Sequence, residues 1–317
     1  MQFRRLGSTD MDFSIIGFGA WALGGGGWAF GWGPQDDRKS IDAIHRALDL
    51  GVNWIDTAAV YGLGHSEEVV SRAIQGRRDK IYIATKCGLT WNEKGKIKGH
   101  VSRDSVRKEV EDSLRRLDID RIDLYQIHWP TRPANDLEAW ETMADLVREG
   151  KIRYAAVSNF SVKQIEPLME IKKPASLQPP YSLLERGIEN GLLGFCREHE
   201  IGVVAYSPMQ CGLLTGKMTA ERVANLPEDD FRRKDPHFKE PNLSRTLQRV
   251  EQMKTMAQAA GRTPAQLSLA WVLSRPGVTS AIVGTRDPAQ IEETVTAADR
   301  VLTEDEAQAV ESLFASQ

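Results

Sequence analysis

The chain alternates eight short apolar segments with amphipathic stretches of helical period, and this alternation constrains its fold more than any other feature. We interpret the apolar segments as β-strands: IIGFG (15–19), VNWIDTA (52–58), KIYIATK (80–86), RIDLYQIH (121–128), IRYAAVS (152–158), SLQP (176–179), IGVVAYS (201–207) and TSAIVG (279–284). Strands separated by helices form a parallel sheet, and eight such strands close into a barrel. The sequence therefore predicts an α/β protein built as a (β/α)8 TIM barrel.

Two further segments modify this plain alternation. Residues 2–13 contain two short stretches joined by a turn at 7–10, which indicates a β-hairpin that closes the barrel floor. Residues 207–243 are rich in charge and proline and have little periodicity, and loops of that length are usually functional or mobile. Because no linker-like stretch interrupts the 317 residues, we expect residues 1–317 to form a single barrel domain.

The charge composition argues against nucleic acid and membranes as partners. The 41 basic and 44 acidic residues are interspersed, so there is no basic stripe for nucleic acid and no polybasic arm for a membrane. Residues 13–35 carry no charge but contain eight glycines, too many for a stable spanning helix. We therefore expect a small-molecule partner and leave the oligomeric state open.

The three cysteines, Cys87, Cys196 and Cys211, are odd in number and show no CxxC spacing. Neither a disulfide framework nor a zinc site is indicated. A metal-dependent barrel hydrolase is a further alternative, but no HxH pair ends a strand and we expect no metal. A reducing cytoplasm fits this pattern best.

One match to a dinucleotide-binding fingerprint has to be weighed. Gly17, Gly19 and Ala22 follow a predicted strand with G-x-G-x-x-G/A spacing. The fingerprint requires a helix directly afterwards, and the residues that follow are GGGGWAFGWGP, in which no helix can begin before about Pro34. We therefore reject a Rossmann-type cofactor site at this position.

Four residues near the ends of successive predicted strands form a plausible proton-delivery group: Asp56, Tyr61, Lys86 and His128. A tyrosine phenol titrates near about 10 and is a poor acid at neutral pH unless a nearby ammonium lowers its pKa. Lys86 is the candidate ammonium, and Asp56 could hold it by an ion pair. His128 could orient or polarise a substrate carbonyl.

Barrel geometry brings these residues together, since all barrel strands present their carboxyl ends at one mouth. Further polar residues fall at such ends: Ser158, Asn159, Gln178 and Tyr206. Each of them alone has an ordinary structural interpretation, such as a turn cap or a rim contact. Their joint placement favours a functional site.

With these residues in place, the chain resembles the aldo-keto reductases over nearly its whole length. The motifs that carry the resemblance are DTAAVYGLGHSEE, ATK, DLYQIHWP, GKIRYAAVSNF, LQPPYSLLER and AYSPMQCGLLTGK. The glycine-rich first loop and the last two motifs look most similar to bacterial members related to inositol-linked and general-stress reductases. The resemblance implies that Tyr61 protonates a carbonyl oxygen as a nicotinamide delivers hydride, with Asp56, Lys86 and His128 in support.

The resemblance also implies a cofactor that lies extended across the barrel mouth. Its carboxamide would contact Ser158, Asn159 and Gln178, its nicotinamide ring would stack on Tyr206, and its pyrophosphate would lie on residues 207–212 and Lys217. The full set of expected cofactor residues is Ala20, Trp21, Asp56, Ser158, Asn159, Gln178, Tyr206, Ser207, Pro208, Met209, Cys211, Gly212, Lys217, Gly284, Arg286, Gln290 and Glu293.

The loop VGTRDPAQIEET is where the family reads the 2′-phosphate of the cofactor. Arg286 is the strongest candidate clamp there, because a guanidinium suits a phosphate dianion. NADPH (NADP+) is therefore favoured over NADH. The alternative is a rim arginine that pairs with Asp287 or with a neighbouring helix.

Substrate identity is less determined by the sequence. Five tryptophans in or beside the predicted mouth loops indicate an aromatic pocket for aldehydes or ketones, although tryptophan also serves in core packing: Trp21, Trp28, Trp32, Trp91 and Trp129. A barrel of this family can alternatively serve as a cofactor-sensing subunit with little turnover. The complete set of four candidate catalytic residues favours catalysis.

Overall fold

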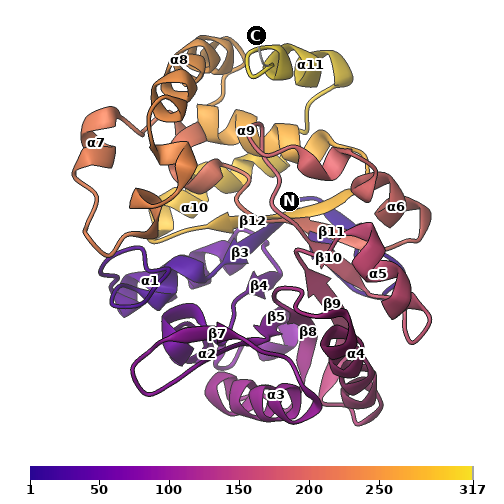
Figure 1. The fold of residues 1–317 in the computed structure, drawn as a ribbon. Helices are drawn as coiled ribbons and strands as arrows, with labels where there is room; N and C mark the ends of the chain where they lie inside the picture. The colour runs from indigo at the N-terminus through magenta and orange to yellow at the C-terminus, as the bar shows by residue number, and fades with distance from the viewer. Residues whose placement is uncertain (316–317) are drawn as a thin grey trace.

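The computed structural model describes residues 1–315, so the last two residues of the expected domain, 316 and 317, lie outside the described part. Eight parallel strands form a closed barrel, seen near its axis in Figure 1. The strands are β3 (Ile16–Gly19), β4 (Trp54–Asp56), β5 (Tyr82–Cys87), β8 (Ile122–Ile127), β9 (Ile152–Ser158), β10 (Ser176–Gln178), β11 (Gly202–Ala205) and β12 (Val278–Gly284). Each overlaps one predicted segment, and the (β/α)8 TIM barrel is confirmed.

Helices surround the barrel (Figure 1). The α-helices are α1 (Asp37–Asp49), α2 (His65–Ile74), α3 (Arg103–Leu117), α4 (Pro133–Arg148), α5 (Val162–Met169), α6 (Leu192–Glu198), α7 (Ala220–Ala224), α8 (Asn242–Ala259), α9 (Pro264–Ser274), α10 (Pro288–Val295) and α11 (Glu304–Ser312). Among the helices of residues 1–315, none combines the length and the apolar character that a bilayer crossing requires.

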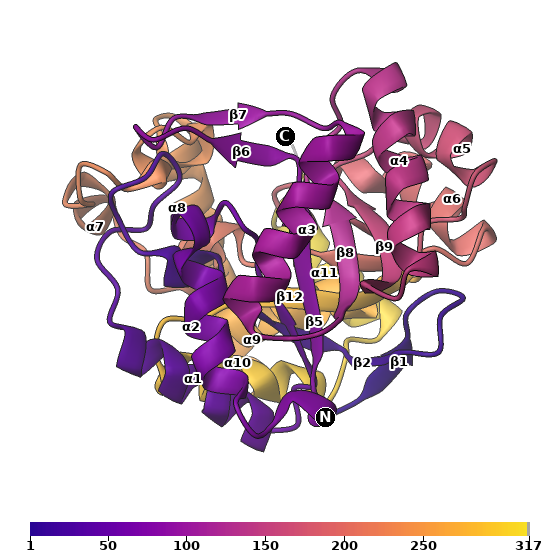
Figure 2. The same cartoon turned by 90° about the horizontal axis from the view of Figure 1, so that it is seen from below.

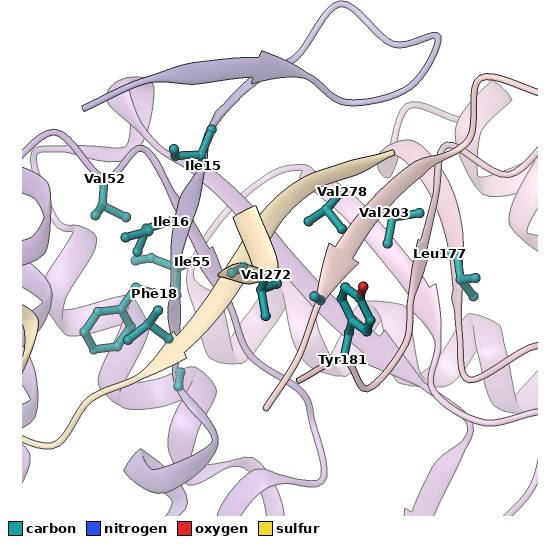
Figure 3. Close-up of a cluster of buried hydrophobic side chains, with 14 of the residues drawn as sticks. Ile15, Ile16, Phe18, Val52, Ile55, Leu177, Tyr181, Val203, Val272 and Val278 are labelled. Atoms are coloured by element: carbon teal, nitrogen blue, oxygen red, sulfur yellow. The ribbon is translucent and has the colours of Figure 1, made fainter. Parts of the chain in front are cut away.

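The main core lies between the strands and these helices. Successive side chains of a strand point to opposite faces, so every second residue of a barrel strand faces outward. Ile16, Phe18, Ile55 and Val203 are outward-facing and fully buried, and Figure 3 shows them beneath the helical layer. This packing explains why the predicted strands read as nearly continuous apolar runs.

A second core fills the barrel interior and its floor. The hairpin of β1 (Phe3–Arg5) and β2 (Asp12–Ser14) contributes Leu6, Met11 and Phe13 to this cluster. The Phe13 ring stacks on the indole of Trp54, with ring centroids 4.6 Å apart. The predicted floor-closing hairpin is therefore confirmed, and Figure 2 shows it at the opposite end of the barrel from β6 and β7.

The glycines of the rejected fingerprint have a packing role. A Cβ added at Gly17 would lie 2.1 Å from Trp54 Cε2, and one at Gly19 would lie 2.8 Å from Ile282 Cγ2. No α-helix follows them until Asp37, where the Asp36 side chain accepts a hydrogen bond from the Lys39 amide. These glycines thus make room for large side chains inside the barrel.

Two loops at the mouth contain structure that the sequence did not predict. A second hairpin, β6 (Leu89–Trp91) and β7 (Ile97–Gly99), stands beside the mouth (Figure 2). The 207–243 segment folds into short helices that contact the glycine-rich first loop: the Asp229 carboxylate accepts from the Gly27 amide at 3.0 Å, and the Phe231 amide donates to the Gly31 carbonyl at 3.1 Å. The first loop and this segment together cover one side of the mouth.

The close contact between Gly17 and Trp54 predicts that a larger residue at position 17 destabilises the protein. The indole Nε1 donates to the Ser14 carbonyl at 3.1 Å and to Ser280 Oγ at 3.2 Å, so the ring cannot easily move aside. We expect Gly17→Ala to lower the free energy of unfolding by about 1–3 kcal/mol through overpacking. Urea denaturation followed by circular dichroism measures this loss.

The matched control is Gly194→Ala, because Gly194 lies exposed in α6 with no heavy atom within 4 Å of an added Cβ. There the substitution should be neutral or stabilising, since alanine is the better helix former. Equal stabilities for Gly17→Ala and the wild type would contradict this account of the barrel interior.

Candidate active site

A cavity of about 960 Å³ opens at the carboxyl ends of the barrel strands. The sequence-predicted site residues that line it are Trp21, Trp32, Asp56, Tyr61, His128, Trp129, Ser158, Asn159, Gln178, Tyr206, Ser207, Pro208, Met209, Cys211, Gly212, Lys217, Gly284, Arg286, Gln290 and Glu293. Three predicted residues do not line it. Lys86 is buried in contact with Tyr61 and Asp56, Ala20 is buried in the first loop, and Trp91 is a half-buried residue of the second hairpin.

A buried lysine forms the centre of the proton-delivery group. Lys86 Nζ lies 2.6 Å from Asp56 Oδ1, 2.8 Å from the Thr57 carbonyl oxygen and 3.3 Å from the Tyr61 hydroxyl. An ammonium has three donors, and these three contacts use all of them. The sequence analysis named Asp56 and Tyr61 as partners but missed the Thr57 carbonyl.

The local backbone brings Tyr61 to this lysine. Tyr61 begins a short 3-10 turn (Tyr61–Gly64) in the loop after β4, and Gly62 within it has φ +62°. A Cβ at Gly62 would lie 2.5 Å from the Gly24 carbonyl oxygen, so only glycine lets the first loop approach this closely. The turn therefore fixes the tyrosine and the first loop against each other.

Burial controls the protonation states of the group. Burial lowers the pKa of Lys86, while the neighbouring Asp56 carboxylate raises it in part. Burial, followed by the charge of Asp56, raises the pKa of Tyr61 well above its ordinary value. This differs from our expectation that Lys86 lowers the phenol pKa, because Asp56 largely neutralises the ammonium and the ring is removed from water.

His128 stands at the end of β8 and faces the tyrosine. The centroids of the Tyr61 and His128 rings are 5.8 Å apart, with the rings nearly perpendicular. Its backbone amide donates to the Cys87 carbonyl at 3.0 Å, which continues the β5–β8 pairing. Burial, and then the Lys86 charge, lower the pKa of His128 well below its ordinary value, so its ring is neutral at physiological pH.

Polar side chains from β9, β10 and β11 are joined in one hydrogen-bonded group. Asn159 Nδ2 donates to the His128 carbonyl and to Ser158 Oγ, both at 3.0 Å. The Tyr206 hydroxyl donates to Asn159 Oδ1 at 2.9 Å, and Ser158 Oγ donates to the Gln178 carbonyl at 2.9 Å. These four residues thus form a pre-organised amide and hydroxyl surface next to Tyr61.

The loop after β11 winds tightly through left-handed backbone conformations. Ser207, Gln210, Cys211 and Gly212 all have positive φ, between 45° and 99°. Within the loop, the Gln210 amide donates to the Ser207 carbonyl and the Gly212 amide donates to the Met209 carbonyl. Lys217, just beyond this loop, forms an ion pair with Glu293 of α10 at the cavity wall.

Arg286 makes its contacts to the first loop. Its Nε donates to Gln35 Oε1 at 2.6 Å, and its terminal nitrogens donate to the carbonyls of Trp32, at 3.2 Å, and Pro34. No ion pair within residues 1–315 involves its guanidinium, and burial lowers its pKa. The alternative expectation, an ion pair between Arg286 and Asp287, is therefore wrong. The sequence could not predict the observed acceptors, because they lie about 250 residues from Arg286 in the chain.

Aromatic side chains form the remaining wall. Trp21 packs on Phe231 with ring centroids 4.7 Å apart, and Phe231 lies edge-on to Trp32 at 4.9 Å. Trp91, with Leu89 and Ile97 of the second hairpin, packs against the buried cluster that contains Trp28 and Tyr61. Cavity-lining residues that the sequence analysis did not single out include Phe30, Leu89, Ile97 and Met218. Their signal was weak, since only the tertiary contacts bring their loops to the mouth.

The cavity suits a nicotinamide dinucleotide. It is lined by Tyr61 and His128, by the polar side chains of Ser158, Asn159 and Gln178, and by the charged side chains of Lys217 and Arg286. Within the described residues there is no group of three or more His, Cys, Asp or Glu side chains suited to a metal ion.

Similarity to known proteins agrees with this geometry. The model of the Aldo/keto reductase family matches residues 15–315. The aldo-keto reductase YhdN of Bacillus subtilis is 39% identical over 295 residues, covering 92% of this chain and 87% of its own length. The NADH-specific methylglyoxal reductase of Escherichia coli is 35% identical over 327 residues, covering 96% of this chain and 98% of its own length.

Solved structures show the same relationship. The glycerol dehydrogenase AKR11B4 from Gluconobacter oxydans superposes with a TM-score of 0.88 at 40% identity, covering 98% of this chain and 94% of that one. Fold, cavity and sequence likeness therefore agree over nearly the whole length. The chain belongs to the aldo-keto reductase family of oxidoreductases.

Proposed function

We propose that this protein reduces aldehydes or ketones to alcohols with NADPH, and that Tyr61 is the proton donor. The observation that carries the proposal is the contact of one buried ammonium, Lys86, with both Asp56 and the Tyr61 hydroxyl at the base of the cavity. The methylglyoxal reductase and the glycerol dehydrogenase named above have activities of the same class. The free cysteines are consistent with a cytoplasmic location.

The residues divide the reaction between them. The bound nicotinamide supplies the hydride that attacks the carbonyl carbon. Tyr61 gives its proton to the carbonyl oxygen, and the adjacent Lys86 ammonium stabilises the phenolate that remains. Asp56 keeps the buried Lys86 charged, and the neutral His128 ring helps to place the carbonyl oxygen.

The raised pKa of Tyr61 is compatible with this role. A phenol with a raised pKa stays protonated at neutral pH, so the proton is present when the substrate binds. The positive charge of Lys86 matters most as the phenolate develops, and interactions that strengthen in the transition state are those that accelerate a reaction.

The aromatic residues of the cavity indicate what kind of substrate it would bind. Trp21, Trp32 and Trp129 line the cavity near Tyr61, and Trp129 is 47% exposed at its mouth. We propose that these three contact the apolar part of a carbonyl substrate, with Trp91 packed against the cluster of Trp28 and Tyr61. Titration with NADPH and NADH, followed by assays with a panel of aldehydes and ketones, tests the proposed function as a whole.

The role of Tyr61 is tested by Tyr61→Phe. Removal of the phenolic proton should lower kcat for carbonyl reduction by about 10²–10⁴, while the cofactor dissociation constant stays within a factor of about three. Stopped-flow kinetics and fluorescence titration measure the two quantities. The control is Tyr154→Phe, since the Tyr154 hydroxyl bonds Asp10 at the barrel floor. Wild-type reduction of a reactive aldehyde by Tyr61→Phe would remove Tyr61 as the acid.

The pH profile follows from the directions of the pKa shifts. His128, with its pKa lowered, is already neutral at pH 6.5, and Tyr61, with its pKa raised, remains protonated far above pH 7. Reduction should therefore be nearly constant between about pH 6 and 8. It should fall at alkaline pH, where Lys86 loses its proton below its ordinary value of 10.5.

This profile is measured as kcat/KM under conditions in which chemistry limits the rate. Lys86→Met should remove the alkaline decrease together with most of the activity. An acidic limb near pH 6.5 that disappears in His128→Asn would show instead that the ring titrates as an ordinary histidine.

Cofactor choice is tested at Arg286. If its guanidinium bonds the 2′-phosphate, Arg286→Ala should weaken NADPH binding by about 1.5–3 kcal/mol and leave NADH binding nearly unchanged. Dissociation constants at fixed ionic strength measure both effects. Gln35→Ala is the matched control, because it removes the Nε partner of Arg286 and keeps the charge. Equal losses for both cofactors in the two variants would assign Arg286 to support of the first loop alone.

A further inference from the structure

A buried glutamine that the reaction described above does not use lies directly beneath the site. Gln126 is on β8, two residues before His128, and is fully buried. Side chains two residues apart on a strand share a face, so Gln126 points into the barrel as Leu124 and His128 do. The pairing register places it opposite Lys86 of β5.

Its amide joins the proton-delivery group to the predicted cofactor surface. Gln126 Nε2 donates to Asp56 Oδ2 at 3.2 Å, and Gln178 Nε2 donates to the same oxygen at 2.8 Å. Gln178 Nε2 also donates to Gln126 Oε1 at 3.1 Å. The two oxygens of Asp56 thus have different partners: Oδ1 bonds Lys86, and Oδ2 bonds the two glutamines.

The chemistry of these groups fixes their orientation. An ionised carboxylate can only accept, so each amide must direct its NH2 group towards Asp56. Both donors of Gln178 are then used inside the barrel, and its oxygen Oε1 is directed elsewhere. Gln178 lines the cavity, and no donor within residues 1–315 bonds this oxygen.

We propose that Gln126 is a positioning residue that fixes Gln178 with its side-chain oxygen towards the cavity, as an acceptor for the carboxamide NH2 of the cofactor. Gln126 itself does not touch the cofactor or the substrate. It acts through Gln178 and through Asp56 Oδ2, so that one buried carboxylate aligns both Lys86 and the carboxamide acceptor. This inference rests on the proposed nicotinamide cofactor.

A physical reason supports a role for a glutamine here. The surrounding barrel interior is apolar, with Leu124 and Ala84 in the adjacent layer, and a buried polar group is costly unless it is hydrogen-bonded. Without Gln126, Gln178 Nε2 would retain only Asp56 as an acceptor. One of its two N–H donors would then have no partner, and the side chain would be held by a single hydrogen bond about which it could turn, so its oxygen Oε1 would no longer be fixed towards the carboxamide donor.

The test compares the oxidised cofactor NADP+ with 3-acetylpyridine adenine dinucleotide phosphate, which has a methyl group in place of the carboxamide NH2. The wild type should bind NADP+ about tenfold more tightly, the value of one neutral hydrogen bond. Gln126→Met keeps the volume but removes the amide, and this preference should fall to less than about threefold. Tryptophan fluorescence titration gives both dissociation constants without turnover.

Two further variants make the result specific. Gln178→Met should lose the preference to the same extent, and the double variant should lose no more, because the two residues act on one hydrogen bond. Gln75→Met, at an exposed position after α2, is the control and should keep the wild-type ratio. Gln126→Leu provides a second replacement if the methionine variant does not fold.

The outcomes separate the inference from the proposed function. If Gln126→Met and Gln126→Leu keep the tenfold preference, or weaken both ligands equally, Gln126 has only a structural role and the inference is overturned. If the wild type binds neither dinucleotide, the proposed function itself fails. Loss of the preference in Gln126→Met with unchanged binding of the acetylpyridine analogue supports the positioning role.

Discussion

The ion pair between Lys86 and Asp56 is the interaction on which the rest of the site depends. Both side chains are almost fully removed from water, 0% and 5% exposed, and a buried charge is costly unless it is paired and hydrogen-bonded. The surroundings meet this requirement closely: Thr57 and Tyr61 complete the contacts of the ammonium, and two glutamines complete those of the carboxylate. Removing either charge would leave the other uncompensated, so the cluster behaves as a unit.

The barrel accommodates this buried ion pair although the rest of its interior is apolar. Trp54 and the floor hairpin fill the lower layers, and Gly17 leaves the space that the indole requires. Polar inward-facing residues are concentrated in the layer just below the mouth, where Lys86 and Gln126 are neighbours in the strand register. Stability and chemistry are thus separated along the barrel axis, as the fold generally permits.

The loops, in contrast, form much of the cavity wall. Arg286 holds the first loop through Gln35 and two backbone carbonyls, and Asp229 and Phe231 hold it from the other side. A guanidinium that bonds carbonyl oxygens keeps its positive charge, so it can support the loop and still attract a phosphate. Arg286 thus supports the first loop, and under the proposed function the same side chain would also contact the 2′-phosphate.

The sequence by itself determined the eight strands, the floor hairpin, the polar strand ends and the family, because each depends on local periodicity or on contiguous motifs. Tertiary structure decided the features that depend on distant partners: the acceptors of Arg286, the contacts of the 207–243 segment with the first loop, and the packing of Trp91 against the cluster of Trp28 and Tyr61. It also decided the pKa of Tyr61, which is raised because burial acts on the folded site and has no signature in the spacing of residues. For Gln126, each level decided one part. Strand alternation predicts that its side chain shares a face with His128, whereas only the folded barrel brings Asp56 and Gln178 to its amide.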